Sequence, residues 1–314
     1  MIETRGLRKA FSSRQGREKK TVEAVRGVDL DVSEGEIFGF LGPNGAGKTT
    51  TLRMLATLIE PDGGTATIAG ADLLRDPAEV RRRIGYVAQG GSTWDDSTAR
   101  EELVLQARLY GASKASAQAR AAKVLEGFQL TEYADRKCKT YSGGQRRRAD
   151  IALGIIHEPK VVFLDEPTTG LDPQSRAHMW DEIRRLRAEG MTVFITTHYL
   201  DEADALCDRI SIMDHGEIVA SGTPAALKRE ISGDVVRVGL PVDAVAAAAS
   251  ALAAYKMETY DDSVRLYVDD GATAIPQILR ALDAADVPLG TIELHRPSLD
   301  DVFLTKTGRS LRES

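Results

Sequence analysis

Short apolar runs alternate with helical patterns along the first two-thirds of the chain. Residues 37–41, 161–164 and 192–197 are rich in apolar and β-branched side chains, which predicts strands buried on both faces of a parallel sheet. After the first run, Leu52, Leu55 and Ile59 recur at helical spacing. Strands that alternate with helices in this order predict an α/β fold.

The first 35 residues are expected to form β-structure with one irregular loop. Val28, Leu30 and Val32 alternate with polar residues, as in a strand with one buried face. Four basic residues lie between Phe11 and Val22. We interpret this segment as a solvated loop in preference to a binding patch.

A helical subdomain is predicted inside the α/β core. Residues 95–137 are rich in Ala, Glu, Leu, Lys and Arg and poor in Gly, a composition with high helix propensity. Ser142 then suits the N-cap of another helix. We therefore expect an inserted, mainly helical subdomain over about residues 92–158.

The pattern restarts near Ser232-Gly233-Asp234 as a small α/β unit. Residues 264–268 alternate as in a strand, and residues 275–282 follow helical spacing. We expect one domain over residues 1–231 and a second over residues 232–314. The second domain carries no chemical motif, so regulation or dimerisation is its expected role.

Composition narrows the class of protein. The chain is 42% hydrophobic and 28% charged, as in ordinary globular proteins, and its formal charge of −6 argues against nucleic-acid binding. We expect neither a signal peptide nor a membrane span, because no apolar run reaches about 18 residues. Cys138 and Cys207 are expected to be reduced thiols, and the histidines show no metal-ligand spacing.

A glycine-rich segment after the first apolar run fits the P-loop pattern G-x-x-x-x-G-K-[ST]. Its glycines let successive backbone N–H groups form an anion-binding nest at a helix N-terminus. The Lys side chain is expected to reach the β- and γ-phosphates of a nucleotide, and the first Thr to hold Mg²⁺. The segment comprises Gly42, Pro43, Asn44, Gly45, Ala46, Gly47, Lys48, Thr49 and Thr50.

Three further segments supply candidate chemistry. Ser142-Gly143-Gly144-Gln145 opens a second helix that is built like an anion site. Asp165 and Glu166 follow a buried strand, where Asp165 suits Mg²⁺ binding and Glu166 can polarise an attacking water. His198 follows the next strand and can hydrogen-bond a γ-phosphate or position the water.

In this order, these segments resemble the ATP-binding subunit of an ATP-binding-cassette (ABC) transporter over roughly residues 1–230. The resemblance implies a P-loop NTPase core with an antiparallel β subdomain and an inserted helical subdomain. It implies ATP and Mg²⁺ as ligands, with Mg²⁺ held by Thr49, Gln89 and Asp165. One departure is that Tyr141 replaces the usual leucine before Ser142. The remaining implied roles are the adenine-stacking aromatic Phe11, the Q-loop Gln89, the signature Ser142, Gly143, Gly144 and Gln145, the catalytic Glu166, the D-loop Asp172 and the switch histidine His198.

Residues 297–304 resemble the tail of the daunorubicin/doxorubicin-resistance type of these ATPases. That resemblance implies an exporter of drugs or lipids whose permease is a separate membrane chain. The ATPase subunit would lie at the cytoplasmic face of the cell membrane. The family also implies a head-to-tail dimer, a homodimer or pseudo-dimer, in which two ATP molecules lie between the P-loop of one subunit and the signature of the other.

Two alternatives remain open at this point. A soluble ABC-type ATPase that acts without a permease would carry the same motifs, although this chain has one cassette and no sustained heptads. A non-hydrolysing, ATP-gated regulatory subunit would bind nucleotide in the same way. The presence of Glu166 and His198 favours a hydrolysing enzyme over that second alternative.

Overall fold

The computed structural model describes residues 1–15, 18–231 and 233–309. It divides the chain into two compact units, residues 1–222 and a second unit from residue 223 onward. The boundary inferred from composition, 231/232, falls at the end of helix α8 (Pro224–Ile231), which here belongs to the second unit. Among the described residues, no helix is long and apolar enough to cross a membrane.

The first unit is built on a six-stranded sheet whose strand order is β10-β9-β3-β8-β7-β6. Its strands are parallel except β10, which pairs antiparallel with β9. Every residue of β3, β7 and β8 is buried, as the apolar runs predicted. The strands are β3 (Ile37–Leu41), β6 (Ile84–Val87), β7 (Val161–Asp165), β8 (Thr192–Thr197), β9 (Arg209–Asp214) and β10 (Glu217–Gly222).

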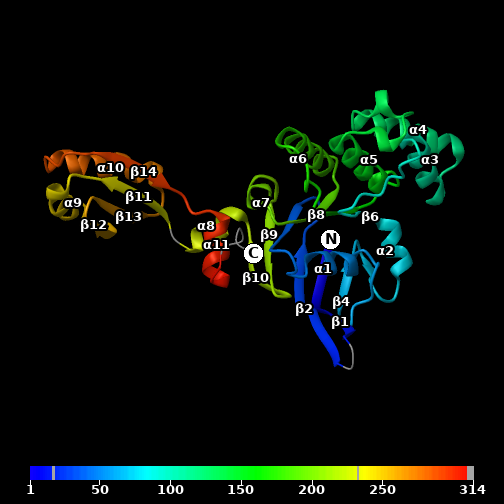
Figure 1. Ribbon diagram of the computed structural model, residues 1–314, viewed down its shortest axis with the longest axis horizontal. Helices are drawn as coiled ribbons and strands as arrows, with labels where there is room; N and C mark the ends of the chain where they lie inside the picture. The colour runs from blue at the N-terminus through cyan, green and yellow to red at the C-terminus, as the bar shows by residue number, and fades with distance from the viewer. Residues whose placement is uncertain (16–17, 232, 310–314) are drawn as a thin grey trace. The chain divides into compact units, whose positions relative to one another are not determined.

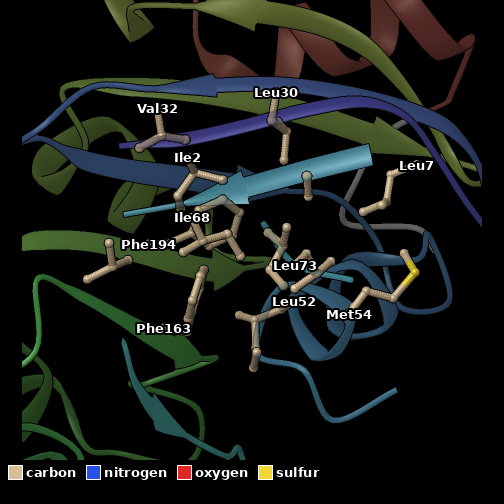
Figure 2. Close-up of a cluster of buried hydrophobic side chains, with 14 of the residues drawn as sticks. Ile2, Leu7, Leu30, Val32, Leu52, Met54, Ile68, Leu73, Phe163 and Phe194 are labelled. Atoms are coloured by element: carbon tan, nitrogen blue, oxygen red, sulfur yellow. The ribbon is translucent and has the colours of Figure 1, made fainter. Parts of the chain in front are cut away.

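An antiparallel sheet packs against this core. Its strand order is β2-β1-β4-β5, and Figure 2 shows its buried side chains, such as Ile2 and Ile68, close to Phe163 and Phe194 of the central sheet. Helix α1 (Lys48–Leu55) packs against β7 and β8 and also against β2, so it joins the two sheets. The strands are β1 (Ile2–Gln15), β2 (Glu18–Val32), β4 (Gly63–Ile68) and β5 (Ala71–Asp72).

The solvated loop expected between Phe11 and Val22 is wrong for its described part. There β1 and β2 continue as a paired ribbon from Ser12 opposite Thr21 to Gln15 opposite Glu18. Phe11 and Val22 face each other in this ribbon and both are exposed. Ser12 and Thr21, the next pair, are exposed as well. The alternation that identifies half-buried strands is therefore missing at these residues, where backbone pairing holds the ribbon.

The inserted helical subdomain is present, as predicted. Helices α3, α4 and α5 pack against one another, and α5 also packs against β6 and β7 (Figure 1). Helix α5 therefore links the subdomain to the central sheet. The helices are α3 (Ala99–Leu109), α4 (Lys114–Gly127) and α5 (Gly143–Ile155), with short 3₁₀ turns η1 (Thr131–Tyr133) and η2 (Cys138–Thr140).

The remaining helices of the first unit flank the sheets. Helix α6 packs against β8, and α7 packs against β3 and β8. Helix α2 begins after the N-cap Asp76 with Pro77 at its first position. Their bounds are α2 (Pro77–Arg83), α6 (Pro173–Ala188) and α7 (Leu200–Leu206).

The second unit contains a βαββαβ module with an antiparallel sheet in the order β12-β13-β11-β14, the arrangement of ferredoxin-like domains. Its core joins the sheet to α9 and α10 through residues such as Val236, Ala248, Leu266 and Ile278. Helices α8 and α11 pack against each other. The elements are β11 (Asp234–Gly239), η3 (Val242–Ala244), α9 (Val245–Ala251), β12 (Lys256–Tyr260), β13 (Ser263–Val268), α10 (Gly271–Ala284), β14 (Thr291–His295) and α11 (Leu299–Thr307).

Candidate functional site

The glycine-rich loop lies between the end of β3 and the start of α1, where the sequence placed it. Gly47 has φ +107° and its missing Cβ leaves room for the carbonyl oxygen of Ala24. A Cβ at Gly42 would collide with the carbonyl oxygen of Met213. Only glycine fits these two positions, so the loop keeps its backbone N–H groups close around the N-terminus of α1.

Lys48 begins α1 and lies buried beneath this loop. Its Nζ donates to the carbonyl oxygens of Gly42 at 2.7 Å and Pro43 at 3.0 Å, and it lies 3.7 Å from Oε1 of Glu166. Burial lowers the pKa of the Lys48 ammonium, and the carboxylates of Glu166 and Asp165 partly offset that effect. A buried ammonium group is poorly solvated, so an anionic ligand that bonds it would stabilise its charge.

Glu166 is the centre of a polar cluster at the end of β7. Its Oε2 accepts from Nε2 of Gln89 at 2.9 Å and from Oγ1 of Thr169 at 3.0 Å. Nδ1 of His198 lies 3.3 Å from the same oxygen without hydrogen-bond geometry. The structure thus brings together Lys48, Gln89, Glu166 and His198, which come from four separate segments of the sequence.

The backbone of Glu166 is unusual. Its φ is +43°, a region that costs a side-chain-bearing residue about 1–3 kcal/mol. Its N–H donates to Oγ1 of Thr196 at 3.0 Å, which helps to hold this conformation. Strain of this kind is retained where the surrounding structure over-determines it, commonly at functional sites.

Asp165 and Thr49 form a second pair beside this cluster. Oγ1 of Thr49 donates to Oδ1 of Asp165 at 3.1 Å, and Oγ1 of Thr196 donates to the same oxygen at 2.6 Å. Since Nε2 of Gln89 donates to Glu166, the amide oxygen of Gln89 remains available as a ligand. Hydroxyl, carboxylate and amide oxygens fit Mg²⁺.

Thr49, Gln89 and Asp165 include only one carboxylate, so these side chains alone do not complete the coordination of Mg²⁺. In the described ranges, no three His, Cys, Asp or Glu residues form a group that could hold a metal ion. Mg²⁺ is usually bound by one or two carboxylates together with waters and substrate phosphates. These residues therefore fit an ion that binds together with a nucleotide.

The signature motif starts helix α5. Ser142 and Gln145 form a capping box in which Oγ of Ser142 accepts from the Gln145 N–H at 3.2 Å and Oε1 of Gln145 accepts from the Ser142 N–H at 3.0 Å. Ser142 and Gly143 are exposed. Each capping-box side chain thus accepts from the backbone N–H of the other residue, at the start of α5 itself.

Two other predicted residues also lie outside the polar cluster. Asp172 caps helix α6, accepting from the N–H and Oγ of Ser175 at 2.9 and 2.7 Å, and these hydrogen bonds lower the pKa of its carboxyl group. Phe11 is 46% exposed on β1, with Nζ of Lys9 5.9 Å from its ring centroid. An exposed aromatic ring is available for stacking on a nucleobase.

Two buried charged residues beside the site were not predicted from the sequence. Arg147 on α5 donates to three backbone carbonyls near Glu166. Glu202 on α7 is fully buried and accepts from Thr168 Oγ1 at 2.8 Å and Trp180 Nε1 at 3.0 Å. The sequence pattern that could have identified Glu202 is its spacing from Leu206. Residues four apart share one face of a helix, so Glu202 lies on the buried face of α7.

The chain is similar to known proteins over most of its length. The ABC transporter family model matches residues 25–169, and the model for the DrrA1-3-like ATP-binding protein C-terminal domain matches residues 222–307. The daunorubicin/doxorubicin resistance ATP-binding protein of Streptomyces peucetius is 44% identical over 98% of this chain and 92% of its own length. The linearmycin resistance ATP-binding protein of Bacillus subtilis is 36% identical over the full length of both chains.

Solved structures of ATP-binding cassettes are also similar to this chain. A dimeric post-hydrolysis state of the ATP-binding cassette MJ0796 bound to ADP and Pi has a TM-score of 0.63 and 27% identity, covering 71% of this chain and 98% of that one. An ATP-binding subunit of an ABC transporter has a TM-score of 0.62 and 28% identity, covering 73% of this chain and 92% of that one. The chain therefore belongs to the ABC transporter family of ATP-binding subunits, in its drug-resistance exporter branch, and is an ATPase.

Proposed function

We propose that this ATPase works as a head-to-tail dimer, with each ATP held between the glycine-rich loop of one subunit and the signature of the other. The observation that carries the proposal is the contrast in burial between two helix N-termini of one chain. Lys48 and Glu166 are buried together at one, whereas Ser142 and Gly143 are exposed at the other. The similarity to a dimeric cassette bound to ADP and Pi supports the same arrangement.

We further propose roles for the residues of the polar cluster. Glu166 acts as the general base toward the attacking water, and His198, 3.3 Å from its Oε2, orients that water or the γ-phosphate. Lys48 leaves its two carbonyl partners and binds the β- and γ-phosphates. Phe11 stacks on the adenine. When bound at Thr49, Asp165 and Gln89, Mg²⁺ would neutralise charge on the phosphates.

Closure of the dimer supplies a physical reason for hydrolysis. The glycine-rich loop alone leaves one side of the γ-phosphate open to water. The N-terminus of α5 from a second subunit, with Ser142, Gly143, Gly144 and Gln145, would add donors and exclude solvent, which strengthens the electrostatic interactions. Asp172, at the start of α6, would lie at the same interface. ATP then favours the closed state, and hydrolysis removes that preference.

We propose that a separate membrane permease uses this cycle for drug or lipid efflux, with the ATPase at the cytoplasmic face of the membrane. A cavity of about 430 Å³ lies beside the segment that follows Gln89. Its wall includes Trp94, Leu105 and Leu109, which are 75%, 59% and 72% exposed. Exposed apolar groups in a concave site suit an amphipathic segment of a partner. The resistance functions named for the relatives support the choice of substrate class.

The dimer is tested by Ser142→Arg. The long side chain would occupy the interface, so turnover should fall by at least about 100-fold, the scale of losing transition-state donors. ATP affinity, measured with a fluorescent ATP analogue, should remain within about threefold because the glycine-rich loop is intact. Light scattering with ATP and without Mg²⁺ should give a dimer for the unaltered chain and a monomer for the variant.

Ser113→Arg is the matched control. Ser113 caps α4 of the same subdomain and is also exposed, so both substitutions remove an N-cap worth about 1 kcal/mol. The control should keep full turnover. A strictly monomeric Ser142→Arg protein with full activity would contradict the dimer. Co-purification with an integral-membrane protein from cell membranes would separate an exporter subunit from an ATPase that acts alone.

A further inference from the structure

Arg147 lies at the junction of three segments that carry the site. It comes from α5, the helix that the signature starts, and it is buried. Its Nε donates to the Pro167 carbonyl oxygen at 2.9 Å, and one terminal nitrogen donates to that of Asp165 at 2.9 Å. The other terminal nitrogen donates to that of Ala88 at 2.6 Å. One side chain thus holds three carbonyls from two separate segments.

Two of these carbonyls belong to the residues on either side of Glu166. Asp165 and Pro167 are its immediate neighbours, and Glu166 itself has φ +43°. A guanidinium group that fixes the peptide unit before a strained residue, and the carbonyl of the residue after it, restricts where the strained residue's side chain can point. The direction of the Glu166 carboxylate therefore depends on the position of Arg147.

The third carbonyl precedes Gln89, whose Nε2 donates to Glu166 at 2.9 Å. Asp150, one turn further along α5, strengthens the same connection. Its Oδ1 accepts from the N–H groups of Ser92 and Thr93 at 2.7 and 2.9 Å. Helix α5 consequently holds the segment around Gln89 on both sides.

We propose that Arg147 is a positioning residue that couples the signature helix to Glu166 and Gln89. The inference rests on the proposed function, in which the signature contacts the ATP of the other site. A small movement of α5, when a second subunit's ATP binds at its N-terminus, would shift the carbonyls that bracket Glu166. Arg147 thereby makes hydrolysis at one site respond to occupation of the other.

The chemistry of the side chain explains why arginine is required. Its planar fork presents several donors in fixed directions, whereas a lysine has one compact ammonium group. Burial lowers the pKa of the Arg147 guanidinium, and Asp150, Asp165 and Glu202 offset part of that cost. Lysine would preserve the charge but could not bond all three carbonyls in the same geometry.

The test compares Arg147→Lys and Arg147→Met with Arg148→Met in the full chain. Arg148 is the next residue on α5, and its side chain bonds Phe128 and Gln129 of the helical subdomain. We expect both Arg147 variants to lower kcat by at least about tenfold, because a misplacement near 1 Å can cost about 100-fold. KM and the affinity for a fluorescent ATP analogue should change by less than about threefold. Arg148→Met should keep its kcat within about twofold.

A double-mutant cycle with Glu166→Gln separates positioning from general stability. If Arg147 acts through Glu166, then Arg147→Lys should lower the residual single-turnover rate of the Glu166→Gln protein by less than about threefold. Equal fold losses in both backgrounds would overturn the inference, as would parallel losses of kcat and nucleotide affinity. If instead the unaltered chain and its Glu166→Gln variant hydrolyse ATP at the same rate, the proposed function itself fails.

Discussion

The two compact units both pair a sheet with helices, but among the residues that the structure describes only the first unit gathers a cluster of buried charged side chains. In the first unit, parallel strands β3, β7 and β8 end at one edge, where Leu41 pairs with Thr197 and Asp165 pairs with Thr196. In the second unit, strands that lie next to each other in the sheet are antiparallel, so adjacent strands end at opposite edges. The comparison shows that strand direction decides whether residues distant in sequence can share one site.

The two units also differ in how exposed their charged pairs are. Lys48 and Glu166, 3.7 Å apart, are 4% and 7% exposed in the first unit. Arg237 and Glu293 of the second unit, 3.9 Å apart, are 45% and 63% exposed. Water screens the exposed pair, which contributes little, whereas the buried pair interacts strongly and is sensitive to any change in charge.

The largest expected difference between the units comes from the same substitution made in each. Glu166→Gln should keep ATP binding but lower turnover by about 100-fold or more, since a general base contributes about 10²–10⁴-fold. Glu258→Gln alters an exposed carboxylate that accepts from the Tyr260 hydroxyl, and turnover should not change. Steady-state phosphate release, with nucleotide binding measured in parallel, checks both variants. Unchanged turnover in Glu166→Gln would remove this residue from the role of base.

A core substitution in the second unit should have an intermediate effect and should separate the units. Ile278 is fully buried in α10, so Ile278→Ala should destabilise the second unit by about 2–5 kcal/mol. Affinity for a fluorescent ATP analogue should not change, because the polar cluster lies in the first unit. Hydrogen exchange measured by mass spectrometry can follow the units separately. Faster exchange of equal size in β3 and β11 would mean that the two units unfold together.

The smallest expected effect concerns pH. Burial raises the pKa of the Glu202 carboxyl above its ordinary value of 4.5, and hydrogen bonds from Thr197, Thr168 and Trp180 oppose that shift. An acid with a raised pKa in the folded state stabilises the fold fully below pH 4.5, and this contribution is lost as pH rises through the raised pKa. The melting temperature should therefore fall as pH rises from 4.5 through the raised pKa, and Glu202→Gln should make this fall smaller. An identical pH profile for both proteins would show that Glu202 does not contribute.

Sequence patterns predicted the buried strands and the inserted helices of the first unit, but they did not predict how far its exposed strands extend. Buried runs identified β3, β7 and β8, and composition identified the inserted helices. The ribbon of β1 and β2 beyond Phe11 was missed because neither Phe11 nor Val22 is covered. A continuous apolar run indicates a strand buried on both faces, and alternation indicates a strand with one buried face. A strand exposed on both faces shows neither pattern.

The sequence alone identified the candidate residues for the chemistry and the segments in which they lie. A glycine-rich loop before a helix and a carboxylate after a buried strand are local features typical of phosphate binding, so the sequence shows them. The carbonyls of Met213 and Ala24 that exclude a side chain at Gly42 and Gly47 are tertiary contacts.

Only the tertiary structure decided that Gln89, Glu166 and His198 meet. It also decided that Arg147 joins the segments of Gln89 and Glu166 through backbone carbonyls. Carbonyl oxygens are the same in every residue, so no sequence pattern records which of them a buried guanidinium will bond.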